Sequence, residues 1–387
     1  MWKFINKLLY WLIRNLLPLI IRPKNKVIFL SEGPSGCNTY ALYTYLSSIP
    51  INFEIEFFMN PSSEHLSSIA QYYKKICYLS SAKLIVTTHG PVSLRFRKEI
   101  NTWHSPLFKS ILAMENSSDS TRLNTNWRGV NVILSYSQLY SSLMVACTLT
   151  NPYRHLITGA PRNDFLFDSD GRRNLEQIIQ TNLDHKKIIL FVPTFRMGYS
   201  KTQGSKNLSN IFGFEEFDAK TFNDFLSNNN ILFVYKLHPN EEAFYSEYTD
   251  LISPDFSFRL NDQILTENGL DFYEIVNCAD ILITDYSGIF IDYLLLDRPI
   301  IFAPIDLENY TKTRNFLYSP FNEWTPGKKV LAQDELVFEI ANLIDGVDEF
   351  RSQRRSATNI WHEHQDNKSS ERTLKLVENL LNEGKVK

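Results

Sequence analysis

A short apolar run, a polar turn and a second apolar segment follow one another at residues 279–293, and this stretch constrains the fold of the 387-residue chain more than any other. Residues 281–284 are apolar and mostly β-branched, which is typical of a buried strand. The turn Asp285-Tyr286-Ser287-Gly288 leads into a segment of helical character, with Ser287 in position to cap it. The stretch therefore predicts a strand, a tight turn and a helix.

A helix that begins at the carboxyl end of a parallel strand is suited to binding anions. Its first backbone N–H groups have no partner within the helix, and the helix dipole is positive at this end. Ser287 and Gly288 are therefore a candidate phosphate or pyrophosphate site. From this turn alone, an ordinary capped junction between strand and helix is favoured, because motifs this short often occur by chance.

Strand and helix patterns alternate along both halves of the chain. The predicted strands are residues 27–30, 51–57, 83–88, 132–135 and 156–159 in the first half, and 188–192, 231–237, 281–284 and 299–303 in the second. Such alternation predicts mainly parallel sheets with helices on both faces. We expect a first domain at residues 27–167, a second at 168–365 and a closing amphipathic helix at 366–387.

The composition is that of a globular protein, with 43% hydrophobic and 21% charged residues. The net charge of −3 gives no indication of nucleic-acid binding. The four cysteines lie far apart and show no metal-ligand spacing, so we expect reduced thiols in a cytoplasmic protein.

Residues 1–26 differ from the rest of the chain. They contain no acidic residue, and six basic residues interrupt a sequence rich in tryptophan and leucine: Lys3, Lys7, Arg14, Arg22, Lys24 and Lys26. The longest uncharged run, 15–21, contains Pro18 and falls short of the ~20 apolar residues that span a bilayer. We expect an interfacial helix on an anionic membrane. A signal peptide fits less well, since no small-residue cleavage site follows, and a helix packed on the protein's own surface remains an alternative.

Candidate polar side chains follow the predicted strands of the second half. Arg196 comes after the strand at 188–192, His238 after that at 231–237, and a loop at 306–314 after that at 299–303. Because parallel strands end at one edge of a sheet, we expect these groups to meet there and to bind a ligand.

His104 is the candidate base of the first half. It lies between Trp103 and a Ser-Pro pair, and its unperturbed pKa of ~6.5 allows it to accept a proton near neutrality. A structural histidine bonded to backbone is the alternative. The two-lobed pattern predicts an enzyme with its ligand in the cleft between the lobes.

Taken in order, several short motifs resemble those of the CDP-glycerol glycerophosphotransferase family, whose members prime and polymerise teichoic acids and related capsule or O-antigen polymers. The motifs are Trp103-His104-Ser105-Pro106-Leu107-Phe108-Lys109, Gly159-Ala160-Pro161-Arg162-Asn163-Asp164, Val192-Pro193-Thr194-Phe195-Arg196, Leu237-His238-Pro239, Ile283-Thr284-Asp285-Tyr286-Ser287-Gly288 and Asp292-Tyr293 with the segments 299–302 and 306–310. The first lacks the glycine that follows histidine in the family, which makes His89 a second candidate for the base. The turn has Gly288 where the family usually has serine.

The resemblance implies two Rossmann-like domains of the glycosyltransferase B type, a nucleotide donor in the C-terminal domain, and neither cofactor nor obligatory metal. It implies that His104 and His238 are catalytic. The donor and its phosphates are expected at Arg196, Thr284, Asp285, Ser287, Gly288, Asp306, Tyr310 and Arg314. His89, Lys109, Arg162 and Asp164 are expected on the acceptor side or in structural roles.

The resemblance further implies transfer of glycerol phosphate from CDP-glycerol to a hydroxyl of a glycan carried on a polyprenyl diphosphate lipid, with release of CMP. His104 would take the hydroxyl proton, and Arg196 and His238 would bind the pyrophosphate. Asp285 would orient His238 or a bound hydroxyl, and the 306–314 loop would hold the nucleotide. The expected location is the cytoplasmic face of the membrane, as a peripheral protein. A CDP-ribitol transferase, a sugar-nucleotide glycosyltransferase and, much less favoured, a non-enzymatic scaffold are the alternatives.

Overall fold

The computed structural model describes residues 2–31, 33, 36–59, 68–115, 127–196, 209–238 and 251–383, with side chains from Leu8 onward. The predicted contributions of the Lys3 and Lys7 side chains, and of Pro239 after His238, lie outside these residues. The chain forms two compact units, the first of Met1–His104, Asp119–Phe165 and Glu363–Lys387, the second of Ser105–Ser118 and Leu166–His362. Each unit therefore combines separate stretches of sequence.

The first unit is built on a six-stranded sheet in which every pairing is parallel. The strand order is β2-β1-β3-β4-β5-β6. Their bounds are β1 (Lys24–Ser31), β2 (Glu54–Met59), β3 (Ala82–Thr87), β4 (Lys98–Asn101), β5 (Val132–Ser135) and β6 (His155–Ile157). The central strands are buried on both faces, which explains their nearly continuous apolar sequences.

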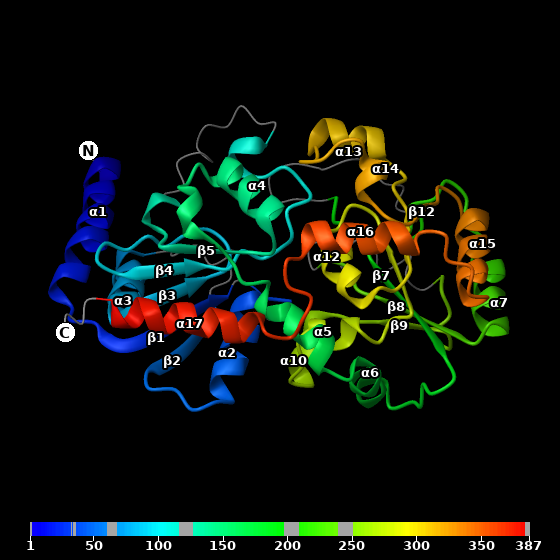
Figure 1. Cartoon of the computed structure of the whole chain (residues 1–387), viewed down its shortest axis with the longest axis horizontal. Coiled ribbons are helices and arrows are strands. Elements are labelled where there is room, and N and C mark those ends of the chain that lie inside the picture. Colours follow the sequence, from blue (N-terminus) through cyan, green and yellow to red (C-terminus); the bar gives the residue numbers. More distant parts are fainter. Residues whose placement is uncertain are drawn as a thin grey trace. The chain divides into compact units, whose positions relative to one another are not determined.

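Helices cover both faces of the first sheet. Val27 and Phe29 of β1 pack with α2 (Asn38–Ser47) and α17 (Ser369–Asn382) on one face. Ile28 and Leu30 point to the other face and pack with α3 (Ile69–Ser80). Figure 1 shows α17 lying along this sheet, although it is the last helix of the chain. Helix α4 (Gln138–Thr148) connects β5 to β6.

Helix α1 (Trp2–Ile20) packs on the first unit through one side. Ile13 and Leu17 lie against the core beneath α3, and the Arg14 guanidinium donates hydrogen bonds to the carbonyl oxygens of Val92 and Ser93. Large apolar side chains elsewhere on the helix are exposed: Leu8, Leu9, Trp11, Leu16, Leu19 and Ile20. Throughout the described ranges, every helix is too short or too polar to cross a membrane.

The second unit is also built on a six-stranded, wholly parallel sheet, in the order β12-β11-β10-β7-β8-β9. The strands are β7 (Lys187–Val192), β8 (Ile231–Tyr235), β9 (Ser257–Arg259), β10 (Ile281–Thr284), β11 (Ile300–Phe302) and β12 (Lys328–Lys329). The predicted organising strand, β10, lies between β7 and β11 and is fully buried.

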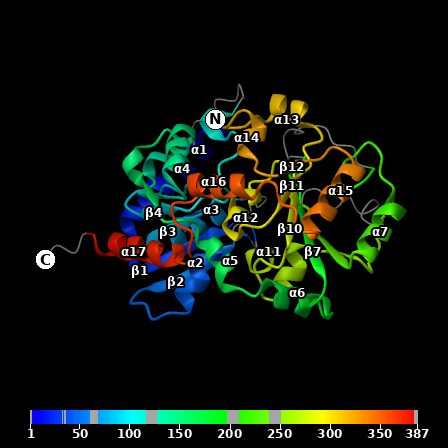
Figure 2. The ribbon, with the colours of Figure 1, turned by 45° about the vertical axis from the view of Figure 1, so that its right-hand side comes forward.

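One face of the second sheet packs against α7 (Ala219–Asn228) and α15 (Gln333–Ile344), through side chains such as Phe222 and Ile340. Both Figure 1 and Figure 2 show these two helices side by side. Among the described residues, the other α-helices of the unit are α6 (Gly171–Ile179), α10 (Asp262–Glu267), α11 (Tyr273–Val276), α12 (Ile289–Tyr293), α13 (Leu307–Thr313), α14 (Phe321–Trp324) and α16 (Arg351–Trp361), and α5 (Phe165–Asp168) lies where the chain enters it. The two parallel sheets confirm the predicted α/β class.

Candidate active site

Predicted site residues follow four neighbouring strands of the second sheet. Arg196 comes after β7, His238 after β8, Asp285 after β10 and Asp306 after β11. These strands are adjacent in the order β11-β10-β7-β8. Because they run parallel, their carboxyl ends share one edge, and the structure brings these residues together as predicted.

Asp285 connects the turns that follow β10 and β7. Its Oδ1 accepts hydrogen bonds from the backbone N–H of Thr194, at 2.7 Å, and from that of Tyr286. The hydroxyl of the adjacent Thr284 donates to the carbonyl oxygen of Val192 at 2.7 Å. Both side chains are buried, and their hydrogen bonds join the carboxyl ends of β7 and β10.

Arg196 lies between two carboxylates and is only 3% exposed. Its Nη2 is 2.9 Å from Asp285 Oδ2, and its Nε and Nη2 donate to the two oxygens of Asp306 at 2.9 Å each. Burial alone would lower the pKa of Arg196, but the two carboxylates raise it, so the guanidinium stays charged. The sequence assigned Arg196 to the donor pyrophosphate. The structure instead places its charge against Asp285 and Asp306, which makes it a residue that positions two loops.

Two stacked tyrosines enclose the Arg196 guanidinium. The rings of Tyr286 and Tyr310 are 4.2 Å apart, and the guanidinium carbon lies 4.9 Å and 5.1 Å from their respective centroids. The Tyr286 hydroxyl donates to Asp306 Oδ1 at 3.0 Å. Both rings are fully buried, so Tyr310 does not offer a face on which a nucleotide base can stack. The sequence indicated Tyr310 but not its pairing with Tyr286.

The loop after β11 borders a pocket of about 370 Å³, lined by Ile305, Asp306, Leu307, Glu308, Asn309 and Lys312. Asp306 lies between this pocket and Arg196. Farther along the loop, Arg314 forms an ion pair with Glu115. The pairing with Glu115 was not predicted, because the two residues are far apart in sequence.

The turn after β10 differs from the prediction in its cap. Helix α12 begins at Ile289 with Gly288 as its N-cap, and no side chain bonds to its first N–H groups. Ser287 is therefore not the cap, and the helix has only five residues. Gly288 approaches Pro106 so closely that an added Cβ would lie 3.3 Å from the Pro106 carbonyl oxygen. A side chain at this position would therefore need Pro106 to shift by a few tenths of an ångström.

His238 lies beside Phe195, with ring centroids 4.3 Å apart. Burial lowers the pKa of His238 to about 4, and the charges of Lys236 and Lys109 act in the same direction. The imidazole is therefore neutral at pH 7 and can donate or accept one hydrogen bond at each nitrogen according to its tautomer. A neutral His238 can bind a phosphate oxygen only through one N–H group, and its predicted binding of the pyrophosphate stays a prediction.

His104 and His89 stack on each other in the first unit. Their ring centroids are 3.9 Å apart and the rings are nearly parallel, at 7°. The Trp103 ring lies 4.4 Å from that of His104. Burial lowers the pKa of His89 to about 4, so this ring is neutral at pH 7. The two candidates for the base thus form one pair, which sequence spacing does not indicate.

Backbone contacts from two buried side chains hold the histidine pair. Asn101 donates to the carbonyl oxygen of His89 at 2.8 Å and accepts from the N–H of Trp103 at 3.0 Å. The Arg162 Nη1 donates to the carbonyl oxygen of His104 at 2.6 Å. Trp103 has a φ of 51°, a left-handed conformation that these contacts maintain. Arg162 therefore has a structural role at the site, and Asn101 is a site residue that sequence reasoning missed.

Asp164 has a structural role in the first unit. Its two carboxylate oxygens accept hydrogen bonds from the backbone N–H groups of Ser369, at 2.9 Å, and Ser370, at 2.8 Å. These are the first residues of α17, whose unpaired N–H groups are satisfied in this way. Asp164 thus fixes the C-terminal helix to the first unit.

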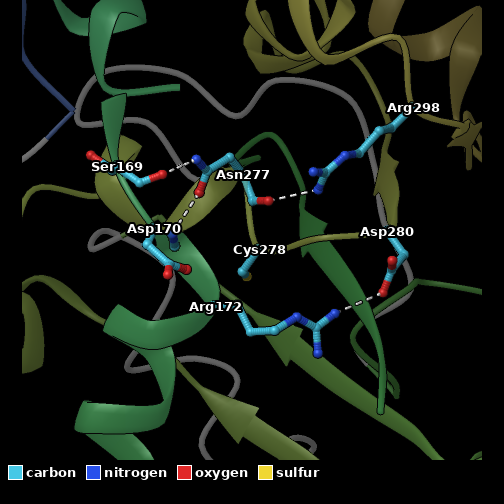
Figure 3. Close-up of a pocket in the computed structure, with 8 residues that line it drawn as sticks. Ser169, Asp170, Arg172, Asn277, Cys278, Asp280 and Arg298 are labelled. Carbon is cyan, nitrogen blue, oxygen red and sulfur yellow. Dashed lines mark hydrogen bonds and ion pairs between the residues drawn. The ribbon is translucent and has the colours of Figure 1, made fainter. Parts of the chain in front are cut away.

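A pocket of about 410 Å³ lies at the opposite edge of the second sheet (Figure 3), lined by Ser169, Asp170, Gly171, Arg172, Asn277, Cys278, Asp280 and Arg298. Asn277 bonds there to the backbone of Ser169 and Gly171, and Arg172 pairs with Asp280 at 3.4 Å. None of the predicted site residues lines this pocket. Its polar groups attach the segment before α6 to the sheet.

The described part of the chain holds no group of three or more histidine, cysteine, aspartate or glutamate side chains arranged to bind a metal ion. At the carboxyl edge of the second sheet, Asp285 and Asp306 face a guanidinium. Protein cations thus occupy the position beside the two carboxylates.

A family model described as CDP-glycerol:poly(glycerophosphate) glycerophosphotransferase matches residues 15–379 of the chain. Among curated proteins, the teichoic acid poly(ribitol-phosphate) polymerase of Bacillus spizizenii is 26% identical over 358 residues, which cover 87% of this chain and 54% of that protein. The teichoic acid glycerol-phosphate primase of Bacillus subtilis is 29% identical over 332 residues, covering 80% of this chain and 76% of the primase. The chain spans about half or less of the length of three matching ribitol-phosphate polymerases.

Among solved structures, the wall teichoic acid polymerase TagF superposes with a TM-score of 0.74 at 19% sequence identity. The match covers 98% of this chain and 94% of the TagF chain. At this identity, the likeness establishes the fold of the chain.

Proposed function

The chain belongs to the CDP-glycerol:poly(glycerophosphate) glycerophosphotransferase family, and from this premise we propose that it transfers glycerol phosphate from CDP-glycerol to a hydroxyl of a lipid-linked glycan. CMP is released, and the product is a teichoic acid or a related capsule or O-antigen polymer. The observation that carries the proposal is the family match over residues 15–379, which takes in the described site residues of both units. CDP-ribitol is the second candidate donor, because matched relatives are named as ribitol-phosphate polymerases and as a ribitol-phosphate primase.

In the proposed reaction, an acceptor hydroxyl oxygen attacks the β-phosphorus of the donor. A new P–O bond forms, the bond from this phosphorus to the oxygen shared with CMP breaks, and CMP leaves with the bonding electrons. His104 takes the hydroxyl proton, and the stacked, neutral His89 supports its ring without competing for that proton. Transfers of this kind depend mostly on positioning and on stabilisation of charge.

In the same scheme, the second unit binds the donor at the carboxyl edge of its sheet. His238, neutral at pH 7, donates an N–H group to a phosphate oxygen, and the backbone N–H groups near Ser287 and Gly288 add further donors. Asp285, Arg196 and Asp306 hold the loops in place. The pocket beside Asp306 offers room for part of the nucleotide or the alditol.

For the location, we propose peripheral binding to the anionic cytoplasmic face of a membrane through α1. Its exposed side carries Leu8, Leu9, Trp11, Leu16, Leu19 and Ile20, while Arg14 and the Ile13–Leu17 side attach it to the first unit. Basic residues near an anionic surface add about 1 kcal/mol each. Leu19→Glu with Ile20→Glu should abolish sedimentation with phosphatidylglycerol vesicles, whereas Asn379→Glu on the exposed side of α17 should not. Equal sedimentation of both variants would refute α1 as the membrane contact.

The transfer reaction is tested by CMP release from purified protein with CDP-glycerol and with CDP-ribitol. Each donor is supplied with and without a detergent-solubilised lipid-linked acceptor, and UDP release from a UDP-sugar is followed in parallel. Acceptor-dependent CMP from one CDP-alditol would support the proposal and identify the donor. Activity with only the UDP-sugar would assign the chain to sugar transfer instead.

A further inference from the structure

The segment after His104 is built into the second unit by backbone pairing. Residues 105–115 are part of that unit, and Lys109 forms an antiparallel bridge with Phe316. Beside this bridge, the N–H of Leu317 donates to the carbonyl oxygen of Phe108 at 3.0 Å. The pairing fixes Lys109 next to the loop that follows α13.

Aromatic packing sets the direction of the Lys109 side chain. Phe108 is fully buried and contacts four aromatic rings at centroid distances of 5.0 to 6.2 Å, those of Phe290, Phe316, Tyr318 and Phe321. Ser110 is buried as well. Because successive side chains of an extended segment point to opposite sides, Lys109 points away from the side that Phe108 and Ser110 occupy.

Lys109 is electrostatically linked to the site residues of the second unit. Burial is the largest cause of a lowered pKa at Lys109; Arg314 and Arg196 act in the same direction and Asp285 opposes them, and the net pKa is about 8. The charge of Lys109 in turn lowers the pKa of His238. The amine is therefore close enough to all four groups for their charges to act on it.

The other cations at this edge have carboxylate partners. Arg196 pairs with Asp285 and Asp306, Arg314 with Glu115, and Lys236 with Asp262 at 2.7 Å. Lys109, by contrast, makes no ion pair or hydrogen bond through its amine within the residues that the structure describes. A half-buried ammonium without a partner is costly, and an anionic ligand would compensate its charge.

Two buried hydroxyl groups at the same edge also have no hydrogen-bond partner in the described part of the chain. They are Thr194 Oγ1, after β7, and the Tyr310 hydroxyl, on α13. Thr194 is 4% exposed and Tyr310 is fully buried. Because a buried hydroxyl without a partner loses hydrogen-bond energy, a polar ligand at this edge of the sheet would satisfy both groups.

We propose that Lys109 binds the diphosphate of the nucleotide donor, a role that rests on the proposed function and replaces the one that the sequence gave to Arg196. The amine is compact and donates through three N–H groups, so it can bind an oxygen of each of two adjacent phosphates. The assignment also moves Lys109 from the acceptor side, where the sequence placed it, to the donor side.

The test compares Lys109→Met, Lys109→Arg and the matched control Lys220→Met, which changes an exposed lysine of α7. The first measurement is the rise in melting temperature that CDP causes, because it does not depend on turnover. Wild-type, Lys109→Arg and Lys220→Met proteins should be stabilised, and Lys109→Met should lose the effect. With an active donor, Lys109→Met should also raise the donor KM about 10- to 100-fold.

A second measurement uses the wild-type protein alone and so remains informative if Lys109→Met does not fold. Acylation of lysines, read by mass spectrometry, should label Lys109, and CDP should protect it while Lys220 is labelled equally in both conditions. Unchanged labelling of Lys109 with CDP, CDP stabilisation of Lys109→Met equal to wild type, or no stabilisation of the wild type would each overturn the proposal. Loss of CDP stabilisation in Lys109→Met without turnover of any CDP-alditol would support Lys109 and refute only the transfer reaction.

Discussion

The two units position their site residues by different means. In the first unit, Asn101 and Arg162 bond to the backbone carbonyl oxygens of the histidine pair, and Asn101 also accepts from the N–H of Trp103. In the second unit, Arg196 is held by side-chain carboxylates and enclosed by aromatic rings. The first arrangement leaves the imidazole nitrogens outside these contacts, whereas the second uses nearly all of the donors of its guanidinium.

This difference separates two kinds of chemistry. The backbone contacts of a histidine do not involve its ring nitrogens, so they persist when the ring changes protonation, as a general base requires. A fully paired arginine cannot exchange partners without exposing buried charge, so it is suited to building a rigid frame. The following experiments test whether the two units differ in this way.

The largest expected effect is on turnover in His104→Asn. If His104 is the base, kcat should fall by about 10²- to 10⁴-fold while the melting temperature changes little, because the ring is held through backbone contacts. CMP release measures the rate, and His89→Gln serves as the control with a smaller expected loss. Near-normal turnover of His104→Asn would remove the proposed base.

Arg196→Met should have the next largest effect, which is a loss of stability. Two buried carboxylates would lose their counter-ion, which costs about 3–5 kcal/mol in the free energy of unfolding. Denaturant titration followed by circular dichroism measures this loss. Arg355→Met, which breaks an exposed ion pair with Asp297 at 3.0 Å, should cost less than about 1 kcal/mol. Similar losses in the free energy of unfolding for both variants would contradict the role of Arg196 in positioning the two loops.

Asn101→Ala should affect both stability and rate. Removing three buried hydrogen bonds should cost about 1–3 kcal/mol, and the displaced backbone of His89 and Trp103 should lower kcat more than it raises KM. Asn379→Ala on exposed α17 should change stability by less than about 0.5 kcal/mol. A variant that loses stability but keeps its kcat would limit Asn101 to a purely structural role.

The smallest expected effect is on the pH dependence of stability. Burial lowers the pKa of His155 to about 4, whereas an unfolded histidine titrates near 6.5. Between these values the unfolded chain binds a proton that the folded chain does not, so stability is lost as pH falls, by up to about 1.4 kcal/mol per pH unit. His155→Gln should flatten the fall in urea midpoint between pH 6.5 and 5. An unchanged slope would show that His155 does not contribute.

The sequence predicted the buried strands well, because β7, β8 and β10 are uninterrupted runs of large apolar side chains. It missed β4, β9 and β12, which are short and each include a basic residue, so their pattern resembles that of a loop. It also placed the predicted 51–57 strand about three residues too early, since β2 begins at Glu54. Strand boundaries at a sheet edge depend on pairing partners that periodicity does not reveal.

The location of the residues that follow β7, β8, β10 and β11 could be predicted, because parallel strands must end at one edge. The side chains that these residues contact could not be predicted. Arg196 and Asp306 are 110 residues apart, and nothing local indicates that one neutralises the other. The stacking of His89 on His104 depends likewise on where β3 and β4 end in space. Predicting Ser287 as a cap failed because helix α12 starts one residue later, at a glycine packed against Pro106.

The attachment of α17 by Asp164 has a consequence for synthesis on the ribosome. The first unit needs residues 363–382 to complete its core, yet these are made after the whole second unit. The second unit can therefore fold while the first still exposes the face that Val377 and Leu380 will cover. We expect the nascent first unit to be a chaperone substrate until α17 leaves the exit tunnel.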